Sequence, residues 1–202
     1  MKVLEEPQNF ECLDKTHHRH PSRMSQMIGE GTYNLGLEYS TSHVVCISGI
    51  ATVAVERGPM LRMVPGCAVT VPGQFELDVQ SHMHEGLKPR VAVIERVGYA
   101  GIYAFHDVTK MHFPSFNQDC LASEDFQGLQ FVKFLPEAES EGRLKYDLFS
   151  VVLAGGGVLI EEGESHNLKP GSMFTLDYWE RFNLNNQSSA QPLVLANFGV
   201  SG

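Results

Sequence analysis

Short apolar runs alternate with turn residues in the second half of the chain, between residues 146 and 177. Residues 151–153 and 158–160 are aliphatic runs of the length of a strand. They are bounded by turn segments at residues 155–157, 162–164 and 170–171. A glycine or proline occurs at least about every eight residues, which disfavours a helix. The pattern therefore predicts a β-meander.

The same pattern occurs in the first half of the chain, between residues 39 and 72. Gly49 corresponds to Gly155, 106 residues later, and the Pro-Gly pair at 65–66 corresponds to the pair at 170–171, 105 residues later. Similarity that keeps a nearly constant offset over this length indicates an internal duplication. We therefore expect two domains: residues 1–101, which begin with a polar N-terminal arm, and residues 102–202.

Each copy contains about eight strand-like segments, with turns at the spacing expected of a β-sandwich or barrel. No window of twelve residues shows a convincing apolar period of 3.6 residues, so we expect little helix. The predicted fold class is all-β, with two tandem β-barrels that arise from the duplication.

Composition and charge narrow the possible partners. The chain has 202 residues and a formal net charge of −9, which argues against a nucleic acid or an anionic membrane as the main partner. The longest apolar stretch, residues 151–160, is too short to span a membrane. The N-terminal segment lacks the apolar core of a signal peptide, and the four cysteines are scattered without a CxxC motif. A cytoplasmic, reduced protein is therefore expected.

The two copies resemble the cupin superfamily, and together they resemble a bicupin. The resemblance rests on a phrase of short strands, a small residue before glycine, and a Pro-Gly turn. It appears as VVCISGIATVAVERGPMLRMVPGCAVTVP and again as SVVLAGGGVLIEEGESHNLKPGSMFTLD. The resemblance implies two jelly-roll barrels, each with a ligand cavity at one mouth.

Metal-dependent cupins bind their metal through a His-x-His pair, a glutamate and a later histidine. The corresponding positions in the first half are Gly36, Glu38, Ser42 and Glu76 or Leu77. In the second half they are Gly142, Leu144, Leu148 and Arg181 or Phe182. None of these residues is a histidine, so no cofactor is predicted. The alternative is a divalent transition metal (Fe, Mn, Ni or Zn) bound by His82 and His84, whose other interpretation is a solvated loop.

Candidate site residues of the first half lie near the expected barrel mouth. His43 and Glu76 form a speculative catalytic pair that could perform acid–base chemistry. Glu38 and Tyr39 are candidate ligand-binding residues. The alternative is that His43 is a hydrogen-bonded structural histidine and that the two glutamates face solvent.

The second half offers an aromatic and charged group of candidate ligand-binding residues, namely Tyr146, Tyr178, Trp179 and Arg181. Trp179 could stack on a planar or sugar ligand, and Arg181 could pair with a carboxylate. Alternatively, the aromatic residues fill the barrel or the contact between the two halves.

The favoured function is a cytosolic bicupin that binds a small polar metabolite in a barrel mouth without the usual metal triad. Whether the protein is an enzyme stays open. One alternative is a metal-independent isomerase or lyase that uses His43 and Glu76, and another is a dioxygenase-type metalloenzyme with a non-standard histidine site. A further possibility is a structural role, and a homodimer formed through edge strands is expected in any case.

Overall fold

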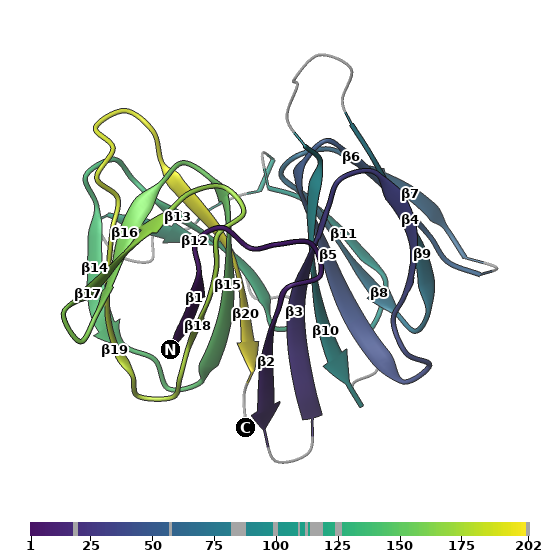
Figure 1. The fold of residues 1–202 in the computed structure, drawn as a ribbon, viewed down its shortest axis with the longest axis horizontal. Helices are drawn as coiled ribbons and strands as arrows, with labels where there is room; N and C mark the ends of the chain where they lie inside the picture. Colours follow the sequence, from purple (N-terminus) through teal and green to yellow (C-terminus); the bar gives the residue numbers. More distant parts are fainter. Residues whose placement is uncertain are drawn as a thin grey trace. The chain divides into compact units, whose positions relative to one another are not determined.

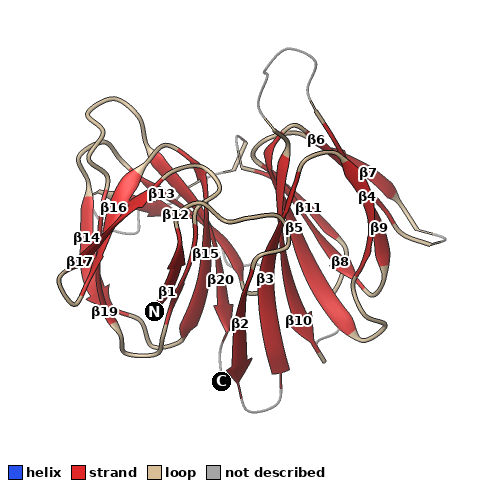
Figure 2. Cartoon of the chain, viewed as in Figure 1, coloured by secondary structure: helices blue, strands red, loops and turns tan. Residues whose placement is uncertain are grey.

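We describe the fold from a computed structural model of the chain. It describes residues 1–17, 20–56, 58–81, 88–98, 101–108, 110–111, 113, 119–123 and 127–200. These residues form strands and turns with no helix among them, which confirms the predicted all-β class (Figure 2). The described residues accordingly contain no helix that could cross a membrane.

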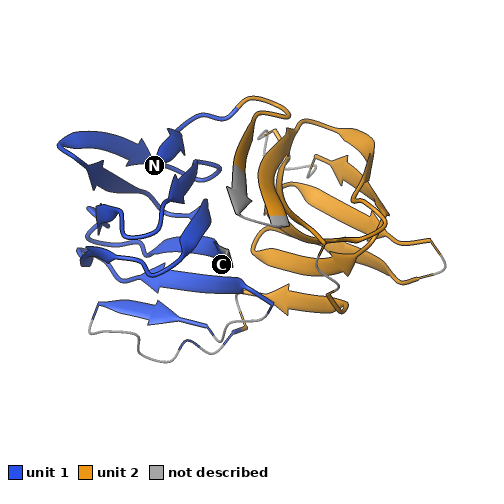
Figure 3. Cartoon of the chain, turned by 90° about the horizontal axis from the view of Figure 1, so that it is seen from below, with its two compact units in different colours: residues 1–7, 111–202 blue, residues 8–110 orange. Residues whose placement is uncertain are grey.

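The chain folds into two compact units, which are coloured separately in Figure 3. We call Gln8–Lys110 the first barrel, and we call Met1–Pro7 together with Met111–Gly202 the second barrel. The duplication predicts a boundary after residue 101. In the structure the division falls after Lys110, and the first seven residues belong to the second barrel.

Among its described residues, the first barrel contains two antiparallel sheets (Figure 1). The larger sheet has the strand order β11-β8-β5-β10-β3-β2, and the smaller has the order β4-β9-β6-β7. The strands are β2 (Cys12–His17), β3 (His20–Ile28), β4 (Gly31–Leu35), β5 (Ser40–Ser48), β6 (Ile50–Ala54), β7 (Met60–Met63), β8 (Cys67–Pro72), β9 (Phe75–Gln80), β10 (Arg90–Val97) and β11 (Ala104–Asp107).

The described part of the second barrel repeats this arrangement. Its larger sheet has the order β1-β18-β15-β20-β13-β12, and its smaller sheet has the order β14-β19-β16-β17. The strands are β1 (Lys2–Leu4), β12 (Cys120–Ala122), β13 (Leu129–Phe134), β14 (Glu139–Arg143), β15 (Asp147–Ala154), β16 (Gly157–Glu161), β17 (Glu164–Leu168), β18 (Met173–Leu176), β19 (Arg181–Asn185) and β20 (Leu193–Val200).

Strands β1 and β11 occupy equivalent edge positions in the two barrels. Lys2 of β1 pairs with Thr175 of β18, and Ala104 of β11 pairs with Thr70 of β8. Each sequence copy therefore contributes its first strand to the barrel that the other copy builds. This reciprocal strand exchange accounts for the shift of the unit boundaries away from residue 101.

The two Pro-Gly turns have the same geometry in both barrels. The amide of Cys67 donates to the carbonyl of Val64 (2.9 Å), and the amide of Ser172 donates to the carbonyl of Lys169 (2.8 Å). Gly66 and Gly171 have φ angles of 87° and 93°. A glycine with positive φ after proline is the signature of a type II turn, so the repeated Pro-Gly pair places β8 and β18 equivalently.

Alternate residues of both sheets form the interior of each barrel. In the first barrel Val44 and Leu77 belong to a buried apolar cluster, as do Phe174, Leu184 and Leu159 in the second. Neighbouring residues along a strand point to opposite faces of the sheet. The position of any polar residue relative to these cluster members therefore tells which face it occupies.

Candidate functional site

The loop between β18 and β19, residues 177–180, distinguishes the second barrel from the first. The corresponding connection between β8 and β9 is residues 73–74, which is two residues shorter. The loop is fixed by hydrogen bonds: the amide of Tyr178 donates to Asp147 Oδ1 (2.7 Å), and the amide of Trp179 donates to the carbonyl of Leu144 (2.9 Å). Trp179 has a φ of 63°, an uncommon conformation for a bulky residue.

A cleft of about 700 Å³ lies against this loop, on the face of the smaller sheet that points away from the interior. Its lining residues come from β14, β16, β19 and the adjoining turns, and they are Glu141, Arg143, Ile160, Glu162, Gly163, Trp179, Glu180, Arg181, Phe182 and Asn183. The side chain of Trp179 is 47 % exposed, so its indole is available to a ligand. Arg181 is paired with Glu141, whereas Arg143 has no ion-pair partner among the described residues.

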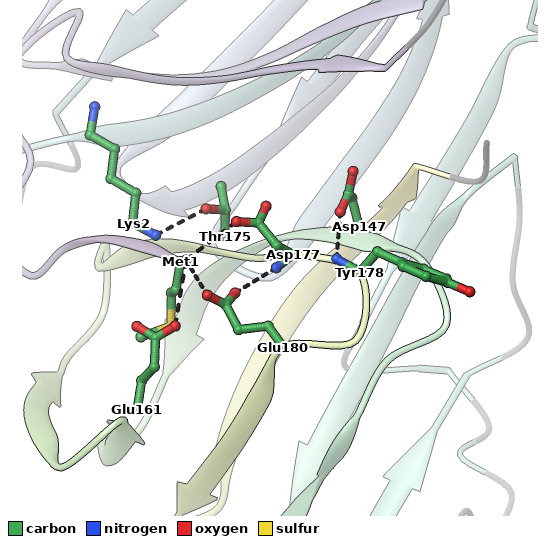
Figure 4. Close-up of polar contacts among 8 residues, drawn as sticks. All are labelled: Met1, Lys2, Asp147, Glu161, Thr175, Asp177, Tyr178 and Glu180. Atoms are coloured by element: carbon green, nitrogen blue, oxygen red, sulfur yellow. Dashed lines mark hydrogen bonds and ion pairs between the residues drawn. The ribbon is translucent and has the colours of Figure 1, made fainter.

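An acidic group lies at the mouth of the same barrel, beside the end of the chain. The α-ammonium group of Met1 contacts Glu180 and lies 3.3 Å from Asp177 Oδ2 and 3.4 Å from Glu161 Oε1 (Figure 4). The side chain of Met1 is only 1 % exposed. The amide of Asp177 donates to Glu180 Oε2 (2.6 Å), which orients this carboxylate toward Met1. We call Glu161, Asp177 and Glu180 the acidic group.

Glu161 has an unusual protonation equilibrium. Burial raises its pKa, and the hydrogen bond and negative charge of Glu180 raise it further, to about 7. The ammonium group of Met1 opposes this shift. The acidic group therefore contains a carboxyl that gains or loses a proton near neutral pH.

The N-terminal segment reaches the acidic group as an edge strand. β1 pairs with β18, and the side chains of Met1 and Val3 pack against the interior cluster of the second barrel. The amide of Lys2 donates to Thr175 Oγ1 (3.2 Å), and Ser172 Oγ donates to the carbonyl of Glu5 (2.8 Å). These contacts hold residues 1–5 along the edge of the larger sheet of the second barrel.

The first barrel has an equivalent cleft without these features. Its volume is about 520 Å³, and its lining residues are Asn34, Leu35, Gly36, Ala54, Val55, Glu56, Gln74, Phe75 and Glu76. It contains no tryptophan and no arginine. Leu159 pairs with Leu184 in the second barrel, and Val53 pairs with Leu77 in the first, so Leu159 and Val53 occupy equivalent positions. Glu161 and Val55 each lie two residues further along, so Val55 is the counterpart of Glu161. An acidic group like that of the second barrel is therefore not repeated here.

The structure does not bring the predicted catalytic pair together. His43 is 1 % exposed, and its Nδ1 lies 2.9 Å from Thr70 Oγ1. Its neighbour Val44 belongs to the interior cluster, so His43 occupies the opposite face of the larger sheet. Glu76 is exposed on the outer face of the smaller sheet, because its neighbour Leu77 points inward. The two side chains point away from the barrel interior on different sheets.

Glu38 and Tyr39 lie in the turn between β4 and β5, and both are exposed. Neither lines the cleft of the first barrel.

The structure brings together two of the four candidates in the second half. Trp179 and Arg181 line the cleft, and the rings of Tyr178 and Trp179 meet edge to face with centroids 5.8 Å apart. Tyr146 and Tyr178 are exposed and do not line the cleft. The aromatic pair thus lies on the loop rather than filling the barrel.

The residues at the positions where metal-dependent cupins bind their metal do not fit a metal ion. Ser42 occupies the position at which those cupins have a glutamate; it is fully buried, and its hydroxyl has no hydrogen-bond partner in the described residues. Its counterpart Leu148 is apolar. Within the described residues, no three histidine, cysteine, aspartate or glutamate side chains are arranged to hold a metal. His82 and His84 lie outside the described residues, so the metal alternative stays a prediction.

Sequence reasoning missed Glu161 and Asp177, and it did not connect Met1 with the second barrel. The two-residue insertion at 178–179 is visible when the copies are aligned, and it marks the loop as special. The role of Met1 has no local signal, because the strand exchange brings it to residues about 160 to 180 positions away.

Comparisons with known proteins show the fold. No protein-family model matches the sequence, and no curated protein matches it. Among solved structures, the chain is similar to the protein Ylba from E. coli, with 13 % identity, a TM-score of 0.67, and coverage of 94 % of this chain and 82 % of that one. It is also similar to a cupin 2 conserved barrel domain protein from Leptotrichia buccalis, with 8 % identity, a TM-score of 0.62, and coverage of 99 % and 96 %.

A third similar structure is the salicylate 1,2-dioxygenase from Pseudoaminobacter salicylatoxidans, described as an adduct with gentisate. The identity is 11 %, the TM-score is 0.61, and the match covers 89 % of this chain and 68 % of that one. Together these matches confirm the predicted bicupin fold of two tandem cupin-like barrels. At such low identity they establish the fold alone.

Proposed function

We propose that the protein binds a small, planar, carboxylate-bearing metabolite in the cleft beside Trp179. The observation that carries this proposal is the presence, in one cleft of about 700 Å³, of an exposed indole and of Arg143, which has no ion-pair partner in the described part of the chain. The indole offers a stacking face, and a guanidinium group can bind a carboxylate through two parallel hydrogen bonds.

The composition of the cleft favours a polar ligand of limited size. Glu141 already neutralises Arg181, so the cation available to an anionic ligand is that of Arg143. Glu162 adds an acceptor for a hydroxyl group of the ligand. The equivalent cleft of the first barrel lacks both the indole and the guanidinium groups, so binding is assigned to the second barrel.

The proposal is tested with gentisate, the planar carboxylate of one structurally similar protein. We expect isothermal titration calorimetry to show saturable binding of one gentisate per chain. Hydroquinone, which has the same ring without the carboxylate, should bind at least about tenfold more weakly, because it leaves Arg143 unpaired.

Variants identify the site. Trp179→Ala and Arg143→Gln should each weaken gentisate binding about tenfold or more, whereas Arg62→Gln, which removes an exposed arginine of the first barrel, should not. Equal affinities for gentisate and hydroquinone, or full affinity in Arg143→Gln, would refute the proposal.

A further inference from the structure

Strand β11 is an exposed apolar edge of the first barrel. It is the last strand of the larger sheet, so among the described residues only β8 pairs with it (Figure 1). Three large apolar side chains in β11 or directly before it, those of Ile102, Tyr103 and Phe105, are 45 to 65 % exposed. An exposed apolar edge strand is a template on which a further strand can pair.

The edge at β11 lacks the charges that other sheet edges of this protein carry. The edge strand β14 of the second barrel contains Glu139, Glu141 and Arg143, and the edge strand β7 of the first contains Arg62. Charged side chains are a common means by which proteins prevent their sheet edges from pairing. Residues 101–106 contain no aspartate, glutamate, lysine or arginine. This edge is therefore open to a further strand.

The main chain at β11 directs the polar groups of Tyr103 and Phe105 to the open edge. The amide of Val108 donates to the carbonyl of Gly66, just before β8 (2.9 Å), so the main-chain groups of Val108 point toward β8. The direction of these groups alternates from residue to residue along an antiparallel strand. The N–H and C=O groups of Ala104 therefore point toward β8, and those of Tyr103 and Phe105 point away from it.

The segment around Ala104 is complementary to itself. In an antiparallel pair of two β11 strands centred on Ala104, Tyr103 of each copy would lie opposite Phe105 of the other. Residues with outward main-chain groups would then face each other, as an antiparallel ladder requires. Phe105 pairs with the interior residue Val69, and Tyr103 lies on the same face two positions earlier. The pairing thus forms two cross-strand aromatic pairs, which stabilise sheets, and it places no like charges opposite each other.

We infer that β11 is the edge through which two copies of this chain form the expected homodimer, with a two-fold axis at Ala104 that joins their larger sheets. A two-fold interface uses the same patch on both copies, which a self-complementary strand provides. The surface belongs to the first barrel, so the inference goes beyond the cleft beside Trp179 and does not depend on it. Because β11 has only four residues, the interface is small, and we expect a dimer that dissociates on dilution.

Sedimentation equilibrium of the full chain over a range of concentrations tests the inference. We expect a reversible equilibrium between monomer and dimer. Phe105→Lys removes one member of each aromatic pair and adds a charge to the edge, so it should raise the dissociation constant of the dimer at least about tenfold. Met60→Lys is the matched control, because Met60 is an exposed apolar residue on β7, another edge strand of the same barrel. It should leave the dissociation constant unchanged.

A cross-link locates the two-fold axis and does not depend on the folding of Phe105→Lys. At the axis, Ala104 of one copy faces Ala104 of the other in a pair without hydrogen bonds. The Cα atoms of such a pair are about 4.5 Å apart, a distance that a disulfide can span. Ala104→Cys treated with oxidised glutathione, which is reduced to two thiols as the disulfide forms, should therefore give a covalent dimer on a non-reducing gel. Met60→Cys should not.

Three results would each overturn the inference. They are a full chain that stays monomeric at every concentration, a dimer that Phe105→Lys does not weaken, and equal cross-linking of Ala104→Cys and Met60→Cys. The first of these would leave the edge at β11 to a strand of another protein.

Discussion

Single residues decide the chemistry of the second barrel. Glu161 ends β16 with its carboxyl turned toward the mouth, where its counterpart in the first barrel is Val55. The exchange of an apolar side chain for a carboxyl at one equivalent position gives the second barrel a group that titrates near neutral pH. His43 shows the opposite case, in which a residue type associated with catalysis is buried against Thr70.

The titration of Glu161 predicts how stability depends on pH. Its pKa is raised from 4.5 to about 7, chiefly by burial and then by Glu180, so between these values the folded state binds more protons than the unfolded state. As far as this group contributes, the free energy of unfolding should therefore be highest below about pH 4.5. It should fall as the pH rises to about 7, by no more than about 1 kcal/mol because solvent screens a partly exposed carboxyl.

Urea unfolding measured at several pH values checks this dependence. The Glu161→Gln variant should lose the decrease between pH 4.5 and 7, because a neutral amide replaces the titrating group. Glu141→Gln changes an exposed carboxylate and should leave the slope as it is. A slope that persists in Glu161→Gln would assign it to another group.

Two glycines with positive φ mark the turns on either side of β16. Gly155 and Gly163 flank β16, with φ angles of 73° and 90°. A Cβ atom at Gly155 would overlap the carbonyl oxygen of Pro192, whereas one at Gly163 would have no atom within 4 Å. Both glycines have a backbone conformation that would strain any residue with a side chain, but they differ in the space around them.

Alanine substitutions separate these two contributions. Gly163→Ala should lower the free energy of unfolding by about 1 to 2 kcal/mol, which is the cost of a side chain in the left-handed region. Gly155→Ala should cost at least about 2 kcal/mol more, because the backbone around Pro192 must shift. Urea unfolding at constant pH measures both variants, and equal losses would show that close approach at Gly155 has no effect.

At the scale of the whole molecule, the exchange of β1 and β11 interlocks the two sequence copies. Residues 1–101 contain β1, which completes the second barrel, and residues 102–202 contain β11, which completes the first. Neither copy contains all the strands of one barrel. The predicted homodimer stays a prediction.

Cleavage of the chain between the copies tests the interlock. A protease site inserted between Gly101 and Ile102 should yield two fragments that stay together in native size-exclusion chromatography, since each retains a strand in the other's barrel. Fragments that also lack residues 1–7 should separate more readily in low urea. If removal of β1 does not affect their separation, the exchanged strand does not contribute to holding the copies together.

The amino-acid sequence by itself determined the all-β class, the duplication and the Pro-Gly turns. These features depend on local chemistry: β-branched runs pair as strands, and a glycine after proline favours a type II turn. Part of the site was also predictable, because Trp179 and Arg181 stand out by residue type within and directly after a loop that is two residues shorter in the first copy. The resemblance of both copies to cupins is confirmed for the fold.

Only the tertiary structure decided which residues meet. The strand that contains His43 is buried on both faces and has apolar residues on each, so its sequence does not tell which side faces the barrel interior. The fold places His43 and Glu76 on the outer faces of different sheets. The acidic group depends on pairing of β1 with β18, which brings Lys2 beside Thr175 from the far end of the chain. Hydrogen bonds between main chains carry no signal of residue type, so the exchange that brings Met1 to Glu161 and Glu180 appears only when the whole fold is assembled.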